Sequence, residues 1–402
     1  MSAPDSIRNI AIVAHVDHGK TTLVDAMFRF AGTFRANQQV AERALDSNDQ
    51  ERERGITILA KAPSIEFRGT RINIVDTPGH ADFGGQVERT LNMADAVLLL
   101  VDSFEGPMPQ TRFVLRKAFE HSLKAIVMVN KIDRPDARPD EVLNEVFDLF
   151  VELGASDDQL EFPVVYGSGR DGWATDDPAK TSDDLMPLFE MLLEHVPTPA
   201  LDADGPLQFQ ATTLDQDDFL GRIAVGRVQR GALELGKRYA LCHPDRDKPL
   251  SVLPKKLLRY EGLERVPAER LECGYIAILT GVEEIGIGDT ICPTEHPAPL
   301  PALALDEPPI SMVFYVNNSP FAGTEGDYVT SRQILARLER AATRDVALRL
   351  AETDSADAFE VKGRGVMHLS VLIETMRREG YEFAVGKPRV IIKEVDGMRC
   401  EP

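Results

Sequence analysis

A short loop of small and polar residues follows the first apolar run of the chain. Residues 14–22 read Ala-His-Val-Asp-His-Gly-Lys-Thr-Thr, after a strand-like run at residues 10–14 and before a helix-like segment. Backbone amides of such a loop, with the N-terminus of the next helix, can surround a β-phosphate. Lys20 would reach the β- and γ-phosphate oxygens, and Thr21 would coordinate magnesium. Ala14 stands where glycine is usual, so an ordinary turn before a helix stays the alternative for this loop alone.

A second loop, Asp76-Thr77-Pro78-Gly79-His80, directly follows the apolar run 72–75. A carboxylate at the end of a strand can hold a magnesium-bound water, and the amide of Gly79 can be offered to a γ-phosphate. Glycine permits that close approach. The pattern Asp-x-x-Gly by itself is commonly just a turn. After a strand and downstream of a phosphate loop, it indicates a nucleotide site.

A third loop, residues 130–133 (Asn-Lys-Ile-Asp), follows the apolar run 125–129. The carboxylate of Asp133 can accept both the N1 and the exocyclic N2 hydrogens of guanine, which adenine cannot supply in that arrangement. A glycine-serine turn at residues 167–169 fits the loop whose backbone approaches the guanine oxygen. Both segments could also be solvated turns, but their order along the chain favours GTP over ATP.

Thr57 lies between the phosphate loop and Asp76, as expected of a loop that closes on magnesium only when a γ-phosphate is present. The charged run 51–54 beside it also reads as a solvated helix. The residues expected to bind the guanine nucleotide are Asp17, His18, Gly19, Lys20, Thr21, Thr22, Gly79, Asn130, Lys131, Asp133, Ser168 and Gly169. The residues expected to hold magnesium are Thr21, Thr57 and Asp76, the last through a water molecule.

Three different sequence patterns follow one another along the chain and predict a multidomain protein with an α/β, a β and an α+β part. Strand-like runs alternate with helix-like segments first, then come short alternating stretches with many glycines, and then the order βαββαβ. In the last of these patterns we expect strands at 310–316, 346–350, 359–362 and 381–385 and helices at 331–342 and 366–378. The expected domains are a P-loop nucleotide domain with a doubly wound sheet (1–200), a β-barrel (201–300), a ferredoxin-like domain (301–395) and the start of a missing further domain (396–402).

The excess of acidic residues limits which molecules the protein can bind over a large surface. With 65 acidic and 45 basic residues the formal net charge is −20, which argues against nucleic acid as the main partner, so any RNA contact must be local. Arg337, Arg340 and Arg344 share one face of an expected helix and could make it, although such residues usually form a solvated face. No apolar run approaches a membrane span and no secretory signal opens the chain, so we expect a cytoplasmic location. The four scattered cysteines suggest free buried thiols, not a zinc site or a disulfide framework.

The motifs at residues 14–22, 54–57, 76–80 and 130–133 together resemble the ribosome-binding translational GTPases, over nearly the whole chain. Residues 317–323 (Asn-Asn-Ser-Pro-Phe-Ala-Gly), with 329–333 and 363–369, resemble specifically the TypA/BipA branch rather than elongation factor G or the LepA type. Ala14, unusual in phosphate loops at large, is what this ribosome-binding group tends to carry.

This resemblance implies a GTPase that forms GDP and phosphate, with GTP/GDP and Mg²⁺ as cofactors. His80 would orient the attacking water once RNA of the large ribosomal subunit pushes it toward the γ-phosphate, with Val16 and Ile56 restraining it beforehand. The implied partner is the ribosome, with no DNA and no membrane partner, a monomeric state, and a role in ribosome function or assembly under stress.

Two other function classes fit part of this pattern. The chain could be a nucleotide-gated binding module in which hydrolysis is incidental. It could also be a metabolic GTPase subunit of the kind that assists sulfate activation, but that class has a second barrel where residues 331–342 and 366–378 read as helices.

Overall fold

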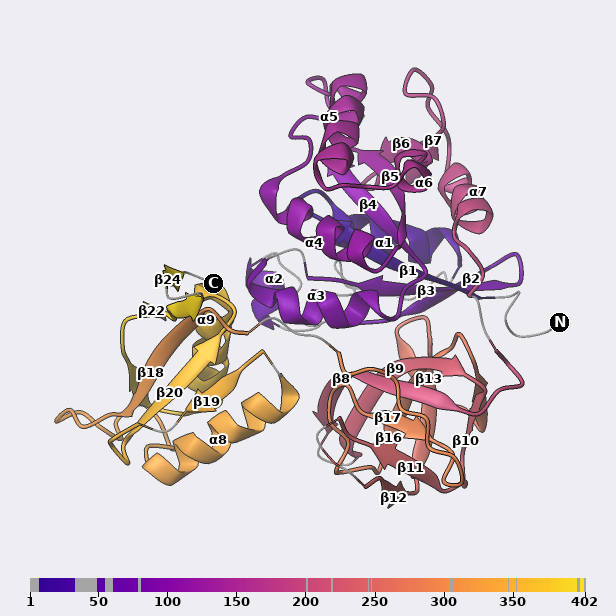
Figure 1. The fold of residues 1–402 in the computed structure, drawn as a ribbon. Coiled ribbons are helices and arrows are strands. Elements are labelled where there is room, and N and C mark those ends of the chain that lie inside the picture. The colour runs from indigo at the N-terminus through magenta and orange to yellow at the C-terminus, as the bar shows by residue number, and fades with distance from the viewer. Residues whose placement is uncertain are drawn as a thin grey trace. The chain divides into compact units, whose positions relative to one another are not determined.

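The computed structural model comprises two compact units, which we describe separately. Unit 1 consists of Met1–His80 and Gln86–Leu303, and unit 2 of Ala81–Gly85 and Ala304–Pro402 (Figure 1). The structure describes residues 7–32, 49–54, 61–78, 81–199, 202–217, 220–244, 246, 248–303, 307–345, 347–351, 353–395 and 398–400.

Unit 1 begins with a seven-stranded sheet in the order β2-β3-β1-β4-β5-β6-β7. The central strands β3, β1, β4, β5 and β6 run parallel, and β2 and β7 pair antiparallel at the two edges. The strands are β1 (Ile7–Ala14), β2 (Ser64–Phe67), β3 (Thr70–Asp76), β4 (Ala96–Asp102), β5 (Lys124–Asn130), β6 (Val164–Ser168) and β7 (Trp173–Thr175). All seven residues of β4 are buried, as expected for a parallel strand covered on both faces.

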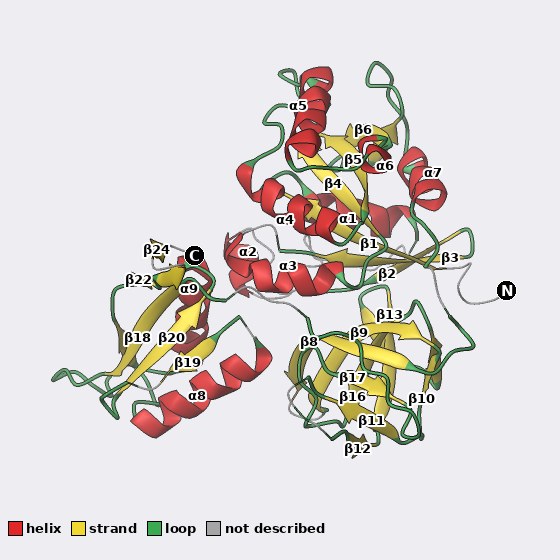
Figure 2. Cartoon of the chain, viewed as in Figure 1, coloured by secondary structure: helices red, strands yellow, loops and turns green. Residues whose placement is uncertain are grey.

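Helices cover both faces of this sheet (Figure 2). Residues of α1 and α7 pack into one hydrophobic core with the sheet, and residues of α3, α4 and α5 pack into a second. The helices of this part of the chain are α1 (Lys20–Phe30), α2 (Asp49–Arg54), the 3₁₀ turn η2 (Ala81–Phe83), α3 (Gly84–Leu91), α4 (Pro109–Glu120), α5 (Pro139–Glu152), α6 (Asp157–Leu160) and α7 (Met186–His195). The expected doubly wound α/β fold is confirmed.

The second half of unit 1 consists of β-strands around a separate core. Eight strands pair in the order β12-β11-β17-β8-β9-β16-β13-β14, and β10 pairs with β15. Figure 2 shows these strands curving around a common interior. Buried side chains, among them Phe209, Val228 and Ile291, form their hydrophobic core. The strands are β8 (Gln208–Asp217), β9 (Gly221–Arg230), β10 (Ala232–Glu234), β11 (Tyr239–Cys242), β12 (Leu250–Val252), β13 (Lys256–Glu261), β14 (Glu264–Pro267), β15 (Arg270–Glu272), β16 (Ile276–Thr280) and β17 (Thr290–Cys292).

Buried polar contacts join the two halves of unit 1. Arg227 in β9 forms a 2.6 Å ion pair with Asp95, which precedes β4, and both side chains are at least 90% buried. Asn9 in β1 donates to the same Asp95 carboxylate at 2.9 Å and to the carbonyl of Gly274 at 3.1 Å. These contacts fix the β-rich half against the base of the parallel sheet.

Unit 2 has the ferredoxin-like order that the sequence predicts. Its strands pair as β19-β20-β18-β21, all antiparallel, with β22 also on β18, and the two helices supply the core residues Leu338 and Leu369. The elements are β18 (Ile310–Val316), α8 (Ser331–Arg344), β19 (Arg349–Ala351), β20 (Ala358–Gly363), α9 (Val366–Arg378), β21 (Phe383–Val385), β22 (Arg389–Val390), β23 (Lys393–Val395) and β24 (Met398–Cys400). Unit 2 also holds Ala81–Gly85, where the Asp82 carboxylate accepts the Met367 amide at 2.7 Å in the first turn of α9.

Three expectations require correction. The strand expected at 346–350 is shorter and later, Arg349–Ala351, because Asp345 caps a turn by accepting the amide of Ala347. Glu51 is fully buried and pairs with Lys61 at 2.9 Å, so the charged run is not simply a solvated helix.

The third correction concerns Arg337, whose position the periodicity of its helix does not reveal. It is only 7% exposed and pairs with Glu379 through Nη2 at 2.8 Å, so it is not available to RNA, and Arg340 donates to the Tyr381 hydroxyl at 3.0 Å. The side chain of Arg344 lies outside the described residues. Among the helices that the structure describes, none is both long and apolar enough to cross a membrane.

Candidate nucleotide site

The motif loops leave the same edge of the parallel sheet. The phosphate loop follows β1, Asp76 ends β3, Asn130 ends β5 and Ser168 ends β6. Because β3, β1, β4, β5 and β6 are parallel, their carboxyl ends lie together, where α/β sheets bind ligands.

The phosphate loop has a backbone that suits an anion. Gly19 has φ 96°, which favours glycine, and a Cβ atom there would lie 2.6 Å from Nδ2 of Asn130. Gly19 is also the N-cap of α1; no described side chain caps the start of that helix, and no acidic residue lies in its first turn. Thr21 and Thr22 follow in that turn. The N-terminal amides of α1 therefore present the positive end of the helix dipole to the loop.

Lys20 and Asp76 face each other at the end of β1 and β3. The Lys20 Nζ atom lies 2.7 Å from Asp76 Oδ1 and also donates to the carbonyl of Thr77. Asp76 is 1% exposed, and apart from this ion pair its Oδ1 accepts no hydrogen bond from the described residues. Thr77 is held in turn, because its hydroxyl donates to the carbonyl of Ile12 at 2.6 Å. A buried carboxylate oxygen with unused acceptor capacity beside a phosphate loop fits a magnesium ion or its bound water.

Asn130 links the phosphate loop to the loop after β6. Its Nδ2 donates to the carbonyl of His18 at 2.8 Å, and its Oδ1 accepts the amide of Gly169 at 2.8 Å. A Cβ atom on Gly169 would lie 3.3 Å from Leu23 in α1, so glycine allows this loop to pack close to the helix. Asn130 thus connects three of the motif loops while one hydrogen of its amide group remains for a base.

Asp133, the residue expected to read guanine, lies in reach of a neighbouring arginine. Its Oδ2 atom is 2.9 Å from Nη2 of Arg170, a side chain that is 75% exposed. Ser168 donates from its hydroxyl to Asp171 at 2.9 Å, which leaves the backbone of residues 168 and 169 as the part that can approach a base. Arg170 therefore neutralises Asp133 here and can swing away into solvent.

The side chain of His18 points away from the phosphate loop. It is completely buried, its Nδ1 accepts the Asp102 amide at 3.3 Å, and its Nε2 therefore carries the proton and donates to Glu105 at 3.2 Å. Burial and the neighbouring His15 lower the pKa of His18, against the opposing effect of Asp102 and Glu105. Only the backbone of His18 is left for the predicted nucleotide contact.

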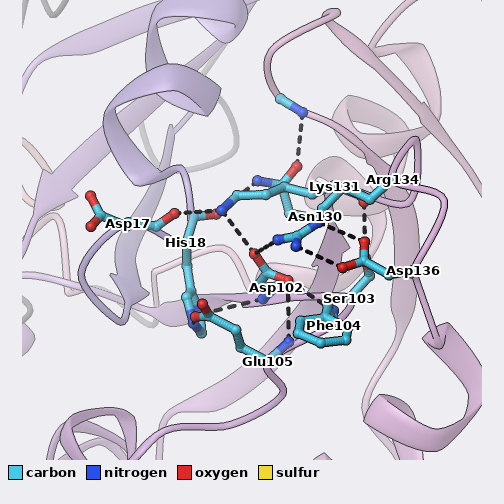
Figure 3. Close-up of polar contacts among 11 residues, drawn as sticks. Asp17, His18, Asp102, Ser103, Phe104, Glu105, Asn130, Lys131, Arg134 and Asp136 are labelled. Atoms are coloured by element: carbon cyan, nitrogen blue, oxygen red, sulfur yellow. Dashed lines mark hydrogen bonds and ion pairs between the residues drawn. The ribbon is translucent and has the colours of Figure 1, made fainter.

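A cluster around Asp102 connects these loops, and motif matching gives no sign of it (Figure 3). Asp102 Oδ2 lies 2.8 Å from Lys131 Nζ and 3.4 Å from Nη1 of Arg134. Lys131 Nζ also donates to the carbonyl of Asp17 at 2.6 Å, so the lysine spans from the 130–133 loop to the phosphate loop. Burial pushes the pKa of Asp102 up, but the hydrogen bonds from Lys131, Phe104 and Glu105 hold it below its ordinary value.

Three predicted residues cannot be placed. Thr57, Gly79 and His80 lie outside the described residues, as does Ile56. Their expected roles in binding magnesium, contacting the γ-phosphate and orienting water remain predictions.

Comparison with known proteins shows what this chain is similar to. A family model described as the elongation factor Tu GTP binding domain matches residues 5–198. A protein named large ribosomal subunit assembly factor BipA from Bacillus subtilis is 56% identical over 100% of this chain, which covers 66% of that protein. A protein of the same name from Synechocystis is 53% identical over 100% of this chain, which covers 67% of it. The chain belongs to the TypA/BipA family. The similarity to these relatives extends over the whole chain, beyond the residues that the family model matches.

The chain spans about two thirds of the length of its relatives, 65% for the protein of the same name from Salmonella typhimurium, which is 54% identical. A solved structure of a protein from Thermus thermophilus, titled only as ttk003000868, superimposes with a TM-score of 0.72 at 19% identity. That match covers 98% of this chain and 72% of the other, and it supports the multidomain fold alone.

Proposed function

We propose that this chain is a GTP-binding and GTP-hydrolysing switch of the translation-factor type that binds the ribosome. The observation that carries the proposal is the bridging role of Asn130 and Lys131. Asn130 joins His18 to Gly169, and Lys131 joins the 130–133 loop to Asp17. A ligand with phosphates at one end and guanine at the other would span these same loops.

Each end of the nucleotide has its own recognition chemistry. The amides at the start of α1 and the Lys20 ammonium group would bind the phosphates once Lys20 leaves Asp76. Asp133 would leave Arg170 and accept the two N–H groups of guanine. Lys20 would thus exchange one anion for another, and the buried Asp76 carboxylate that it leaves would be compensated by the magnesium ion proposed for this site.

Thr21, Thr57 and Asp76 would hold Mg²⁺, with Asp76 acting through water. Mg²⁺ supplies neutralisation of the charge on the β- and γ-phosphates when it is bound. In the hydrolysis that we propose, a water oxygen bonds to the γ-phosphorus as the bond to the β–γ bridging oxygen breaks, giving GDP and phosphate. His80 would orient that water, and phosphoryl transfer otherwise depends on positioning and charge neutralisation.

The partner that we propose is the large ribosomal subunit in the cytoplasm, with its RNA as the activator of hydrolysis and with this chain as a monomer. The relatives that match the whole chain are named for assembly of that subunit. Since the residues predicted to act at the γ-phosphate, Lys20, Gly79 and His80, include no arginine, we expect slow intrinsic hydrolysis and stimulation by the ribosome of roughly 10³-fold or more.

Replacement of His80 by alanine tests the hydrolysis part of the proposal. We expect ribosome-stimulated phosphate release to fall roughly 100-fold while GDP affinity stays within about twofold of the unaltered chain. Phosphate release that is unchanged in His80→Ala would leave a nucleotide-gated binding module as the better description.

Co-sedimentation with purified large ribosomal subunits tests the partner. We expect the chain to pellet with a non-hydrolysable GTP analogue and to remain in solution with GDP. Equal pelleting with both nucleotides, or none with either, would contradict a GTP-controlled ribosome switch.

A further inference from the structure

We propose that Asp102 is a positioning residue for nucleotide binding, which acts by fixing the Lys131 ammonium group against the phosphate loop. Asp102 ends β4, a strand whose end carries none of the three sequence motifs. The inference rests on the proposed function, because it concerns the same nucleotide site.

The Asp102 carboxylate is buried and fully used. Asp102 is 0% exposed; Oδ1 accepts the Phe104 amide at 2.8 Å and the Glu105 amide at 3.3 Å, while Oδ2 faces Lys131 Nζ at 2.8 Å. The two amides hold the carboxylate rigidly, and a buried carboxylate needs a cation. The fixed partner in this pair is therefore the aspartate, and the lysine is the group that it positions.

Lys131 needs such a support. Its backbone has φ 62°, which is unfavourable for a residue with a side chain, and its four-carbon stem loses considerable rotamer freedom when it is held. Its Nζ donates to the carbonyl of Asp17 at 2.6 Å, and Asp17 itself has φ 63°. Without Asp102, we expect the ammonium group to move into solvent, which would leave the Asp17 turn of the phosphate loop unsupported.

The end of β4 also holds both loops through other bonds. The backbone amide of Asp102 donates to Nδ1 of His18 at 3.3 Å. Ser103 donates from its hydroxyl to the carbonyl of Lys131 at 2.9 Å and from its amide to the carbonyl of Asn130 at 2.8 Å. A nucleotide that contacts the phosphate loop and residues 130–133 at the same time requires a fixed distance between these two loops. The hydrogen bonds of residues 102 and 103 to both loops would fix that distance.

Asp102→Asn tests the inference, since the amide nitrogen cannot accept from Lys131 whereas the new side-chain oxygen can still accept the Phe104 amide. We expect the rate of release of a fluorescent GDP analogue, measured by stopped-flow chase, to rise roughly tenfold. A change of that size is typical when one charge-assisted hydrogen bond is lost. Asp289→Asn is the matched control, because Asp289 is also 0% exposed and accepts a backbone amide, that of Gly286 at 2.7 Å, but belongs to the β-rich half and not to the motif loops, so it should leave release unchanged.

A double-mutant cycle separates positioning from general stability. Lys131→Met should itself speed GDP release, and adding Asp102→Asn to it should change the rate by less than about twofold. An equal increase in both backgrounds would show that Asp102 does not act through Lys131 and would overturn the inference. Should Asp102→Asn fail to fold, Ser103→Ala removes one bond to the Lys131 carbonyl and should raise the release rate about fivefold.

The possible failures are distinguishable. Release from Asp102→Asn at the rate of the unaltered chain overturns the inference but leaves the proposed function standing. If the unaltered chain does not bind the GDP analogue at all, the proposed function fails and the inference fails with it.

Discussion

At the scale of single residues, the candidate site depends on backbone positions that few side chains tolerate. Gly19 has φ 96° and lies against Asn130, and Asp17 and Lys131 have positive φ without being glycine. Strained positions of this kind persist only where the surroundings impose them, and they gather at functional sites. Here Lys131 and Asn130 impose them by binding the carbonyls of Asp17 and His18.

Gly19→Ala should lower GDP affinity roughly 100-fold, because the new methyl group would lie 2.6 Å from Nδ2 of Asn130 in a left-handed backbone. Isothermal titration with GDP measures the loss. Gly32→Ala is the matched control: its φ is 68° but no atom of the described residues lies within 4 Å of the new Cβ, so it should cost stability without changing GDP affinity. Equal affinity losses in both variants would show that strain alone, and not the clash, matters.

The buried His18 should make folding stability depend on pH. Burial, with His15, lowers its pKa, so between the folded value and the ordinary value of about 6.5 the unfolded chain binds more protons. Stability is therefore complete above pH ~6.5 and falls as pH drops below it, by at most about 1.4 kcal/mol per pH unit. Urea unfolding between pH 8 and 5.5 should show a steeper loss for the unaltered chain than for His18→Asn, and parallel curves would refute this assignment.

At the scale of elements, the parallel sheet brings the motif loops together at one edge. The β-rich half contacts the turn that precedes β4. Strand order explains why the motif loops lie close together, since β1 lies between β3 and β4, and β5 lies between β4 and β6. The contact of the β-rich half is ionic, because Arg227 reaches from β9 to Asp95 and to the carbonyls of Met93 and Ala94. The β-rich half therefore fixes the turn before β4. At the other end of the same strand, Asp102 pairs with Lys131 in the candidate site.

Arg227→Met should destabilise unit 1 by about 3 kcal/mol, because it leaves the buried Asp95 carboxylate without its cation. Chemical denaturation measures the change. The matched control is Arg230→Met on the same strand, whose pair with Asp202 is 39% and 50% exposed and should contribute less than about 1 kcal/mol. Similar losses in the two variants would mean that burial does not set the strength of this contact.

At the scale of the whole molecule, the strongest physical constraint is charge. A net charge of −20 opposes a broad RNA interface, and burial of Arg337 removes one of the three arginines considered for it. Any contact with ribosomal RNA must therefore use few phosphates.

We expect the affinity for large ribosomal subunits to depend weakly on salt. A log–log plot of association constant against KCl concentration, at constant Mg²⁺, should have a slope no steeper than about −3, since each phosphate contact contributes roughly −0.7 to −0.9. Sedimentation at several KCl concentrations gives the slope. A value near roughly −8 would reveal a large basic interface that the described residues do not show.

The fold class and the motif loops were predictable from local pattern. Polar residues directly after buried strands predicted that Lys20, Asp76 and Asn130 serve one nucleotide site, and the structure places their loops at the carboxyl ends of neighbouring parallel strands. Both helices of unit 2 and the strand Ile310–Val316 were likewise predictable from their apolar spacing. These features depend on residue types and on short spacings along the chain, both of which are read directly from the amino-acid sequence.

Local sequence pattern did not reveal which polar groups are buried or what they pair with. Asp102 meets Lys131 because β4 and β5 are neighbours, and nothing in the local pattern of either strand marks the pair. The same holds for the His18 side chain, which turns toward Asp102 and Glu105, and for Arg337, which Glu379 neutralises. Burial of a charge depends on partners far away in the chain, and these are set only when the strands and helices pack.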